Sequence, residues 1–269
     1  MDFAEVRRYE SGDDVRAMDW RVTARTGKPH TKLFQEDKER PVFLVVDQTT
    51  PMFFGSERAF KSVAAAETAA LIAWTALEGG DRVGGIVFDD AAHREVRPRR
   101  GKRAVLRLLG AVHDANVRLP VRTEPTGEAK AIAGRARLAD ALEAARRTAR
   151  HGALAVVISD FTTLDARAFR HLQQLGRGTE LLGIRIADRY ERELPPPDTY
   201  TITDGTIRTR IDTRSARARD RFVSAARDLH ETQAEAFARA RATLIELGTG
   251  EEPVATLGDR LRAMLGART

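Results

Sequence analysis

The sequence has no cysteine, only six lysines and few aromatic residues. Without cysteine the chain can form no disulfide, thiolate metal site or cysteine nucleophile, which is in keeping with a cytoplasmic protein. No apolar run approaches the ~20 residues that span a bilayer. The charged segment at residues 1–8 is unlike a signal peptide. We therefore expect a soluble, cytoplasmic protein.

Common enzyme motifs are also absent. The two Gly-Lys pairs, at 27–28 and 101–102, lack the upstream glycine of a phosphate-binding loop. No Gly-x-Ser-x-Gly sequence occurs, and the six histidines show no metal-ligand spacing. These absences favour a protein that is not an enzyme.

Length and composition are those of a globular protein. At 269 residues, with 42% hydrophobic and 31% charged residues, the chain makes one large domain or two small ones. The net charge of +6 comes mainly from arginine. Because these arginines alternate with Asp and Glu along the expected helices, a solvated surface is favoured over a phosphate-binding one.

Two apolar strands that each end in an aspartate organise the chain. Residues 42–46 lead into Asp47, and residues 153–158 lead into Ser159 and Asp160. Neither run alternates with polar residues, which is typical of strands buried on both faces of a parallel sheet. Ligands of such sheets bind beyond the carboxyl ends of the strands. We expect Asp47 and Asp160 at this edge, together with Asp89 and Asp90, which follow the next parallel strand.

The remaining pattern alternates helices with strands. Helices are expected over residues 58–77, 104–117, 138–150, 166–175 and 215–241 and after Pro253, and further strands over 82–88, 92–97 (antiparallel), 180–186 and 243–247. A loop is expected over 119–134. The apolar stripe expected to be buried on the first helix is Phe60, Val63, Ala66, Ala70, Trp74 and Leu77.

This order predicts an α/β fold with a doubly wound, mostly parallel sheet. An irregular arm is expected over residues 1–40, with Met18 and Trp20 inserted into the core. The main domain is expected over 41–269. It includes a hairpin insertion at about 198–213 that turns at Asp204-Gly205.

Asp47 and Asp160 have two interpretations. Asp47 is followed two positions later by Thr49, and together with Asp160 these residues offer oxygen ligands of the kind that Mg²⁺ prefers. Alternatively, the two aspartates cap the loops and helices that follow them. Both interpretations are open at this point.

The same residues resemble a von Willebrand factor A-type domain, in the loop after Asp47 and in the Ile-Ser-Asp that ends at Asp160. Residues 7–25, followed by Lys-Leu-Phe at 32–34, are similar to the bacterial domain-of-unknown-function family 58, and the likeness spans about residues 3–265. The residues that carry this motif are Arg7, Tyr9, Gly12, Asp13, Asp14, Arg16, Asp19, Trp20, Thr23 and Arg25.

The resemblance implies a non-enzymatic protein-interaction module that works with a MoxR-type AAA+ ATPase or binds its client. It also implies a degenerate metal-ion-dependent adhesion site, in which Asp47, Thr49 and Asp160 match ligands while Pro51 and Ala136 replace residues with side-chain oxygen. A weak Mg²⁺ site or none is therefore expected. The partner-binding residues implied are Asp47, Thr49, Thr50, Asp89, Asp90 and Asp160. Family members usually carry a basic segment upstream, so either an earlier start or a short form is expected.

Three further alternatives are open. The chain could be a metal-dependent hydrolase that uses Asp47 and Asp160, although no general base stands at a suitable spacing. It could bind nucleic acid through the basic loop at residues 97–103, which lacks interleaved aromatic residues. The motif at residues 9–25 is either a second contact surface or a structural brace for the N-terminal arm. In the brace, the charged residues would form an internal ion-pair network; they are Asp13, Asp14, Arg16, Asp19 and Arg25.

Overall fold

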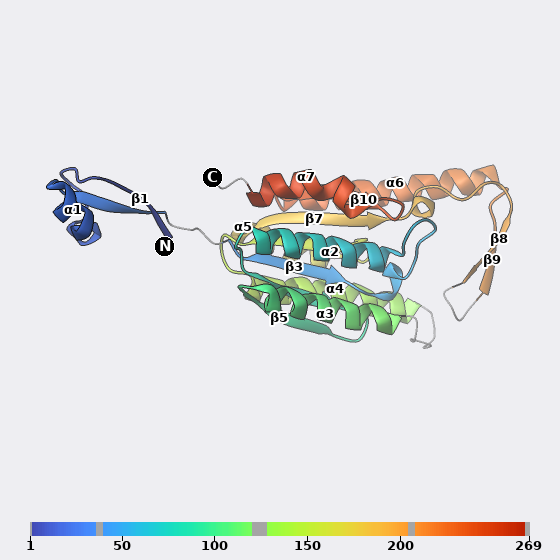
Figure 1. Cartoon of the computed structure of the whole chain (residues 1–269). Coiled ribbons are helices and arrows are strands. Elements are labelled where there is room, and N and C mark those ends of the chain that lie inside the picture. The colour runs from blue at the N-terminus through green and yellow to red at the C-terminus, as the bar shows by residue number, and fades with distance from the viewer. Residues whose placement is uncertain (1, 36–39, 120–127, 204–207, 267–269) are drawn as a thin grey trace. The chain divides into compact units, whose positions relative to one another are not determined.

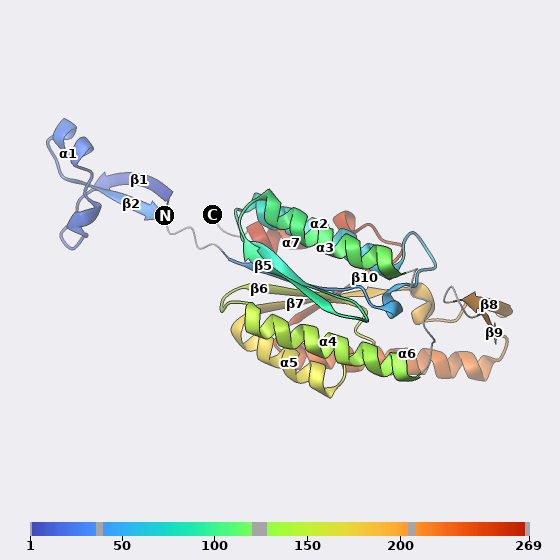
Figure 2. The same cartoon turned by 90° about the horizontal axis from the view of Figure 1, so that it is seen from below.

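The computed structural model describes residues 2–35, 40–119, 128–203 and 208–266. The chain forms two compact units, Met1–Glu39 and Arg40–Thr269. The larger unit is a sheet with helices on both faces (Figures 1 and 2).

The sheet of the larger unit has six strands in the order β10-β7-β6-β3-β4-β5. All neighbours are parallel except β4 and β5. Every residue of the three central strands is buried, as their unbroken apolar sequences predict. The strands are β3 (Val42–Asp47), β4 (Val83–Phe88), β5 (His93–Arg99), β6 (Leu154–Ser159), β7 (Glu180–Ala187) and β10 (Thr243–Gly248). The predicted fold class is confirmed.

Helices cover both faces of the sheet (Figure 2), and the described residues form three on each face. One face packs against α2 (Lys61–Glu78), α3 (Lys102–Arg118) and α7 (Pro253–Gly266), and the other against α4 (Glu128–Thr148), α5 (Ala166–Gly178) and α6 (Ala216–Arg239). Alternate residues of each strand enter the two cores; for example, Leu44 faces α2 and Val45 faces α4. Within the described part of the chain, no helix has both the length and the apolarity needed to cross a membrane.

The buried face of α2 differs from the predicted stripe. Its buried face is mostly alanine, including Ala65, Ala69 and Ala73, together with the larger Ile72. The larger apolar side chains that were expected there, such as Trp74, are only partly buried. Because α2 lies between α3 and α7, its large side chains pack sideways against neighbouring helices, while alanines allow close approach to the sheet.

Two other predictions concern loops. Residues 119–134 are not a loop throughout, because α4 begins at Glu128; residues 120–127 lie outside the described part. The expected hairpin strands pair antiparallel as β8 (Thr199–Thr203) and β9 (Arg208–Asp212). The turn at Asp204-Gly205 lies outside the described residues.

The N-terminal unit is regular, whereas an irregular arm was predicted. It contains the antiparallel pair β1 (Asp2–Arg8) and β2 (His30–Gln35), a short 3₁₀ turn at Val15–Ala17 and α1 (Trp20–Thr26). Trp20 is 66% exposed, so the expectation that it enters the core is wrong. Met18 is half-buried and forms a bridge with Thr31 of β2. A unit of 39 residues has little interior in which to enclose an indole ring.

The polar motif of this unit fixes its local backbone. Asp13 accepts hydrogen bonds from Arg7 Nη2 (2.6 Å) and from the Glu10 N–H (2.9 Å). Asp14 caps the 3₁₀ turn, and Asp19 caps α1 by accepting two N–H bonds of 3.0 Å. These contacts support the brace interpretation for the three aspartates.

We predict that Gly183→Ala destabilises the larger unit by about 1–3 kcal/mol, because a Cβ on Gly183 of β7 would lie 2.2 Å from the Phe237 ring of α6. The matched control is Gly110→Ala in α3, where a Cβ meets nothing within 4 Å and helix propensity favours alanine. Urea denaturation of both variants measures the difference. Equal stability of the two variants would contradict the packing described.

Candidate functional site

Four buried aspartates stand at the carboxyl ends of neighbouring parallel strands. Asp47 ends β3, Asp89 follows β4, Asp160 follows β6 and Asp188 follows β7. The arrowheads of β3 and β7 point to this same edge in Figure 1. We call this row the carboxyl edge. The structure therefore brings together the predicted Asp47, Asp89 and Asp160, and it adds Asp188.

Both carboxylate oxygens of Asp47 accept hydrogen bonds from within the protein. Its Oδ1 accepts from the Thr49 N–H (2.9 Å) and the Thr49 hydroxyl (2.6 Å). Its Oδ2 accepts from the Ser159 hydroxyl (2.6 Å), which joins β3 to β6. Thr49 thus contacts Asp47 as the predicted site requires, and its hydroxyl donates its proton to the carboxylate.

Asp160 forms an ion pair with Lys61, the first residue of α2. Lys61 Nζ lies 2.7 Å from Asp160 Oδ2, and the two side chains are only 1% and 3% exposed. The same ammonium group also bonds Glu191. Thr162 donates its N–H (2.9 Å) and its hydroxyl (2.8 Å) to Asp160 Oδ1. A buried ammonium therefore neutralises the carboxylate that the adhesion-site resemblance assigns to a metal.

The chain beside Asp160 is strained and held in place. Phe161 has a positive φ of 55°, a conformation that costs free energy in a residue other than glycine. Its N–H donates to the Ser159 hydroxyl (3.0 Å), and its ring contacts that of Phe237 edge-on with centroids 4.9 Å apart. These contacts keep the Asp160 loop in one conformation.

Burial and charge shift the protonation of this group. Burial, followed by the charge of Asp160, raises the pKa of Asp47 to about 7, against the hydrogen bonds from Ser159 and Thr49. Burial alone would raise the pKa of Asp160, but the ammonium of Lys61 outweighs it and lowers that pKa. Burial would likewise lower the pKa of Lys61, and the charges of Asp160 and Glu191 raise it instead.

The other predicted edge residues contact one another. The N–H and the hydroxyl of Thr50 both donate to Asp90, at 3.1 and 2.6 Å for its Oδ2. Asp89 accepts the N–H groups of the two residues that follow Asp90, and its other oxygen pairs with Arg118 (3.2 Å). These carboxylates therefore order the turn between β4 and β5.

This donor set does not fit a divalent cation. The Lys61 ammonium already places a positive charge against Asp160, which opposes a second cation there, and the oxygens of Asp47 and Asp160 accept hydrogen bonds from hydroxyl, N–H and ammonium donors. Pro51, in the 3₁₀ turn Thr50–Met52, has no side-chain oxygen. Among the side chains that the structure describes, no group of three or more His, Cys, Asp or Glu residues is arranged to hold a metal ion. Ala136 lies within α4, and its surroundings are outside the description.

Asp188 anchors a second part of the carboxyl edge that sequence reasoning missed. It accepts the N–H and the hydroxyl of Ser56, both at 2.7 Å, and the Thr249 hydroxyl at 2.6 Å. Burial alone would raise the pKa of Asp188, but these hydrogen bonds outweigh it and lower that pKa. The sequence does contain a signal for this residue, because Asp188 follows an apolar strand in the same way as Asp160 does.

Exposed aromatic residues lie in the loop that follows β3 at this edge. Phe54 is 39% exposed and Phe60 is 43% exposed. The rings of Phe53 and Phe60 are in contact, with centroids 4.7 Å apart. The Lys61 N–H donates to the Phe54 carbonyl at 2.7 Å, so the same residue that pairs with Asp160 fixes this loop. The prediction had placed Phe60 in the core.

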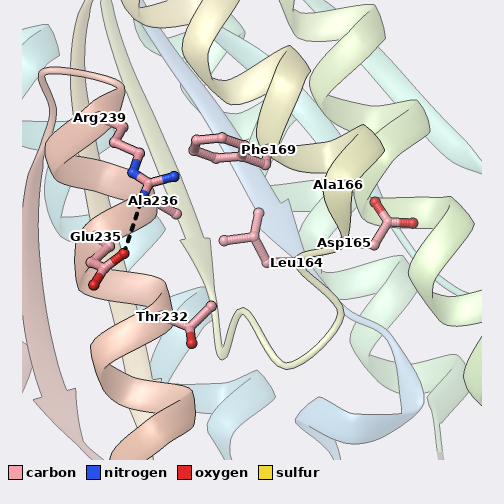
Figure 3. Close-up of a pocket in the computed structure, with 8 residues that line it drawn as sticks. All are labelled: Leu164, Asp165, Ala166, Phe169, Thr232, Glu235, Ala236 and Arg239. Atoms are coloured by element: carbon pink, nitrogen blue, oxygen red, sulfur yellow. Dashed lines mark hydrogen bonds and ion pairs between the residues drawn. The ribbon is translucent and has the colours of Figure 1, made fainter.

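A small pocket lies between the loop before α5 and helix α6 (Figure 3). Leu164 and Phe169 extend into it from one side, and Ala236 lines it from α6. Glu235 and Arg239 pair along its rim at 3.1 Å. It opens just beyond the loop that carries Asp160.

Comparison with known proteins identifies a family and relatives of this chain. The chain matches the family described as "Protein of unknown function DUF58" over residues 5–232. It is 34% identical over 200 residues to the uncharacterized protein Rv1480 of Mycobacterium tuberculosis strain H37Rv, a match that covers 74% of this chain and 59% of that protein.

One of the solved structures that are similar to this chain shares its fold at a TM-score of 0.50. The crystal structure of the conserved hypothetical protein BatB from Bacteroides thetaiotaomicron has a TM-score of 0.50 at 12% identity, covering 85% of this chain and 99% of that one. A von Willebrand factor type A structure from Catenulispora acidiphila has a TM-score of 0.42 at 14% identity, covering 88% and 43%.

The sheet and its edge thus define a doubly wound α/β domain, the fold class that the resemblance to von Willebrand factor A-type domains implies. The chain belongs to the DUF58 family, as the motif at residues 7–25 predicts. It spans 59% of the length of the mycobacterial relatives that it matches.

We predict that Asp47 makes the protein less stable as the pH rises from about 4 to 7. In this range the folded protein holds a proton on Asp47 that the unfolded chain has lost, so the free energy of unfolding falls with pH, by on the order of 1–3 kcal/mol. Asp47→Asn carries no such proton. The stability of the wild type relative to Asp47→Asn, measured by urea denaturation, should fall across this range; a constant or rising difference would refute the assignment.

We also predict that Lys61→Met destabilises the protein by about 3–5 kcal/mol, because it leaves the buried Asp160 without its cation. The double variant Lys61→Met/Asp160→Asn should recover most of this loss. Arg58→Met, which removes a more exposed pair with Glu67, serves as the control and should change stability by about 1 kcal/mol or less. Thermal and urea unfolding provide the measurement; additive losses in the double variant would show that the two residues do not interact.

Proposed function

We propose that this protein is a non-enzymatic interaction module that binds a MoxR-type AAA+ ATPase, or the client of such an ATPase, through its carboxyl edge. The observation that carries the proposal is the pair of exposed aromatic side chains, Phe54 and Phe60, beside a row of aspartates held by internal donors. The family and the fold support an interaction module in general. The ATPase as partner is the expectation from the resemblance.

Exposed aromatic residues on an ordered backbone suit a binding surface. Aromatic side chains supply much of the binding energy where proteins associate, and they do so best when the surface is already ordered. Here the Phe53–Phe60 ring contact and the bond from Lys61 to the Phe54 carbonyl limit the motion of the loop. Little conformational entropy would be lost when a partner covers it.

We propose that this contact needs no metal ion. In a metal-dependent adhesion site the ion presents positive charge to a carboxylate of the partner. In this protein the ammonium of Lys61 is buried under the edge and paired with Asp160 and Glu191. Its role would be to hold Asp160 and the start of α2 in place, and the partner would contact the loop that this arrangement supports.

The alternatives have less support. A hydrolase that used Asp47 and Asp160 would need substrate to reach them, and both are buried beneath other groups. Nucleic-acid binding through residues 97–103 stays a prediction. These residues are not one loop, since they span the end of β5 and the start of α3. Lys102, the first residue of α3, lies over the Trp74 ring, 5.9 Å from its centroid, which gives that basic residue a packing role. The exposed Trp20 and Val15 leave the N-terminal unit as a possible second contact surface.

We predict that Phe54→Ser and Phe60→Ser each abolish or strongly reduce recovery of an AAA+ ATPase when the tagged protein is used as bait in lysate of its own host. The matched control is Leu106→Ser, because Leu106 is exposed on α3 near the opposite edge of the sheet. Quantitative mass spectrometry compares the variants, with parallel samples in Mg²⁺ and in EDTA.

The expected result is recovery that is the same in Mg²⁺ and EDTA, is lost in the two phenylalanine variants and is retained in the control. Recovery that vanishes in EDTA would contradict contact without a metal ion. Recovery that both phenylalanine variants retain would remove the carboxyl edge as the binding surface. Absence of any ATPase would refute the proposed partner.

A further inference from the structure

A second charged pocket lies at the carboxyl ends of β7 and β10, on the face of the sheet that α6 covers. Arg185 of β7 and Glu246 of β10 are register partners, so their side chains stand side by side. Arg192, Arg227 and His230 complete the charged lining. Arg185 is only 6% exposed, which places one guanidinium at the buried end of the pocket.

Helix α6 creates this pocket by crossing above β7. Phe237 packs on Gly183, and two helical turns earlier His230 contacts Arg185. Still nearer the start of α6, Val223 lines the pocket and is partly exposed. The helix thus runs antiparallel to β7, and its first half extends past the carboxyl edge (Figure 1).

The pocket carries more positive than negative charge. Its lining holds three guanidinium groups and one carboxylate, Glu246. Arg185 lies 3.4 Å from Glu246 Oε2, which is longer than the about 2.7–2.9 Å of a direct charged hydrogen bond. Arg192 pairs with the other oxygen of Glu246. Two guanidinium charges are therefore in excess within the lining.

The histidine does not add to this excess. Burial, followed by the charges of Arg185 and Arg192, lowers the pKa of His230, so the imidazole is neutral at physiological pH and accepts a hydrogen bond from Arg185. Burial also lowers the pKa of Arg185, and the neighbouring Arg192 acts in the same direction. A carboxylate entering the pocket would relieve both effects.

We infer that this pocket binds a carboxylate of the protein partner, supplied by an acidic side chain or by a chain terminus. The inference rests on the proposed function and identifies the chemistry of the partner. Guanidinium groups recognise carboxylates with two parallel hydrogen bonds. Val223 and Ala226, which also line the pocket, offer apolar contact to the methylene groups of an acidic side chain.

The surroundings select a single carboxylate over a polyanion such as nucleic acid. An adjoining pocket shares Arg192 and Val223 with this one. Its lining includes the carboxylates of Glu57, Glu193 and Glu251. A long polyanion that filled the first pocket would be repelled by these groups, whereas a peptide with one acidic residue would not.

The test uses the ¹⁵N-labelled chain of residues 1–269 and three small probes. N-acetyl-L-glutamate N-methylamide represents an acidic side chain, N-acetyl-L-alanine represents a C-terminal carboxylate, and N-acetyl-L-glutamine N-methylamide is the neutral control. Amide signals of Arg185, His230 and Glu246 are followed by NMR during titration. One or both acidic probes should shift these signals to saturation, and the neutral probe should not.

Two exposed arginines of α6 provide a matched pair of variants that leave the core intact. Arg227→Gln changes the pocket lining, and Arg221→Gln changes an exposed position outside it. The first should weaken binding of the acidic probe by about threefold, and the second should leave it unchanged. Equal shifts with the acidic and the neutral probes, or equal affinity of the two variants, would overturn the inference.

The outcome separates this inference from the proposed function. Saturable binding of an acidic probe supports the pocket even if no ATPase is recovered with the bait protein. Conversely, the ATPase could be recovered equally well with Arg227→Gln and in the presence of the acidic probe. That result would leave the proposed function standing and overturn the role of the pocket.

Discussion

The ion pair between Lys61 and Asp160 is the contact on which the arrangement of the carboxyl edge depends. Lys61 begins α2, Asp160 follows β6 and Glu191 follows β7, so one ammonium group joins three elements. Removing such charges from water is unfavourable unless both are paired and hydrogen-bonded. The hydroxyl and N–H donors of Thr162 complete this condition for Asp160.

The other aspartates of the edge follow the same rule. Asp47 is held by Ser159 and Thr49, and Asp188 by Ser56 and Thr249, so each buried carboxylate ties its own strand to a neighbouring strand or loop. The protein's own hydroxyl groups therefore donate hydrogen bonds to the carboxyl groups of Asp47 and Asp188. In the proposed function this hydrogen-bonded edge supports the Phe54 loop, and the pocket beneath α6 carries positive charge elsewhere.

The sequence predicts the layers of this fold better than its surfaces. Unbroken apolar runs before Asp47 and Asp160 identify buried parallel strands, because only strands covered on both faces lack polar alternation. The neighbouring helices α3 and α7 help to decide which side of α2 packs on the sheet. The sequence of α2 does not reveal this, so the prediction wrongly placed Phe60 in the core. Lys61 was missed because a lysine at a helix start is ordinarily solvated, and only the tertiary structure brings a residue 99 positions away to pair with it.

We propose that the ammonium of Lys61 takes the place of a metal ion at Asp160. Titration of the protein with Mn²⁺ tests this most directly. Bound at the predicted site, this paramagnetic ion would broaden the NMR amide signals of Thr49 and Thr162, whose N–H groups contact the two aspartates. We predict no selective broadening at these residues in the wild-type chain. Selective, saturable broadening there that Asp47→Asn abolishes would contradict the account.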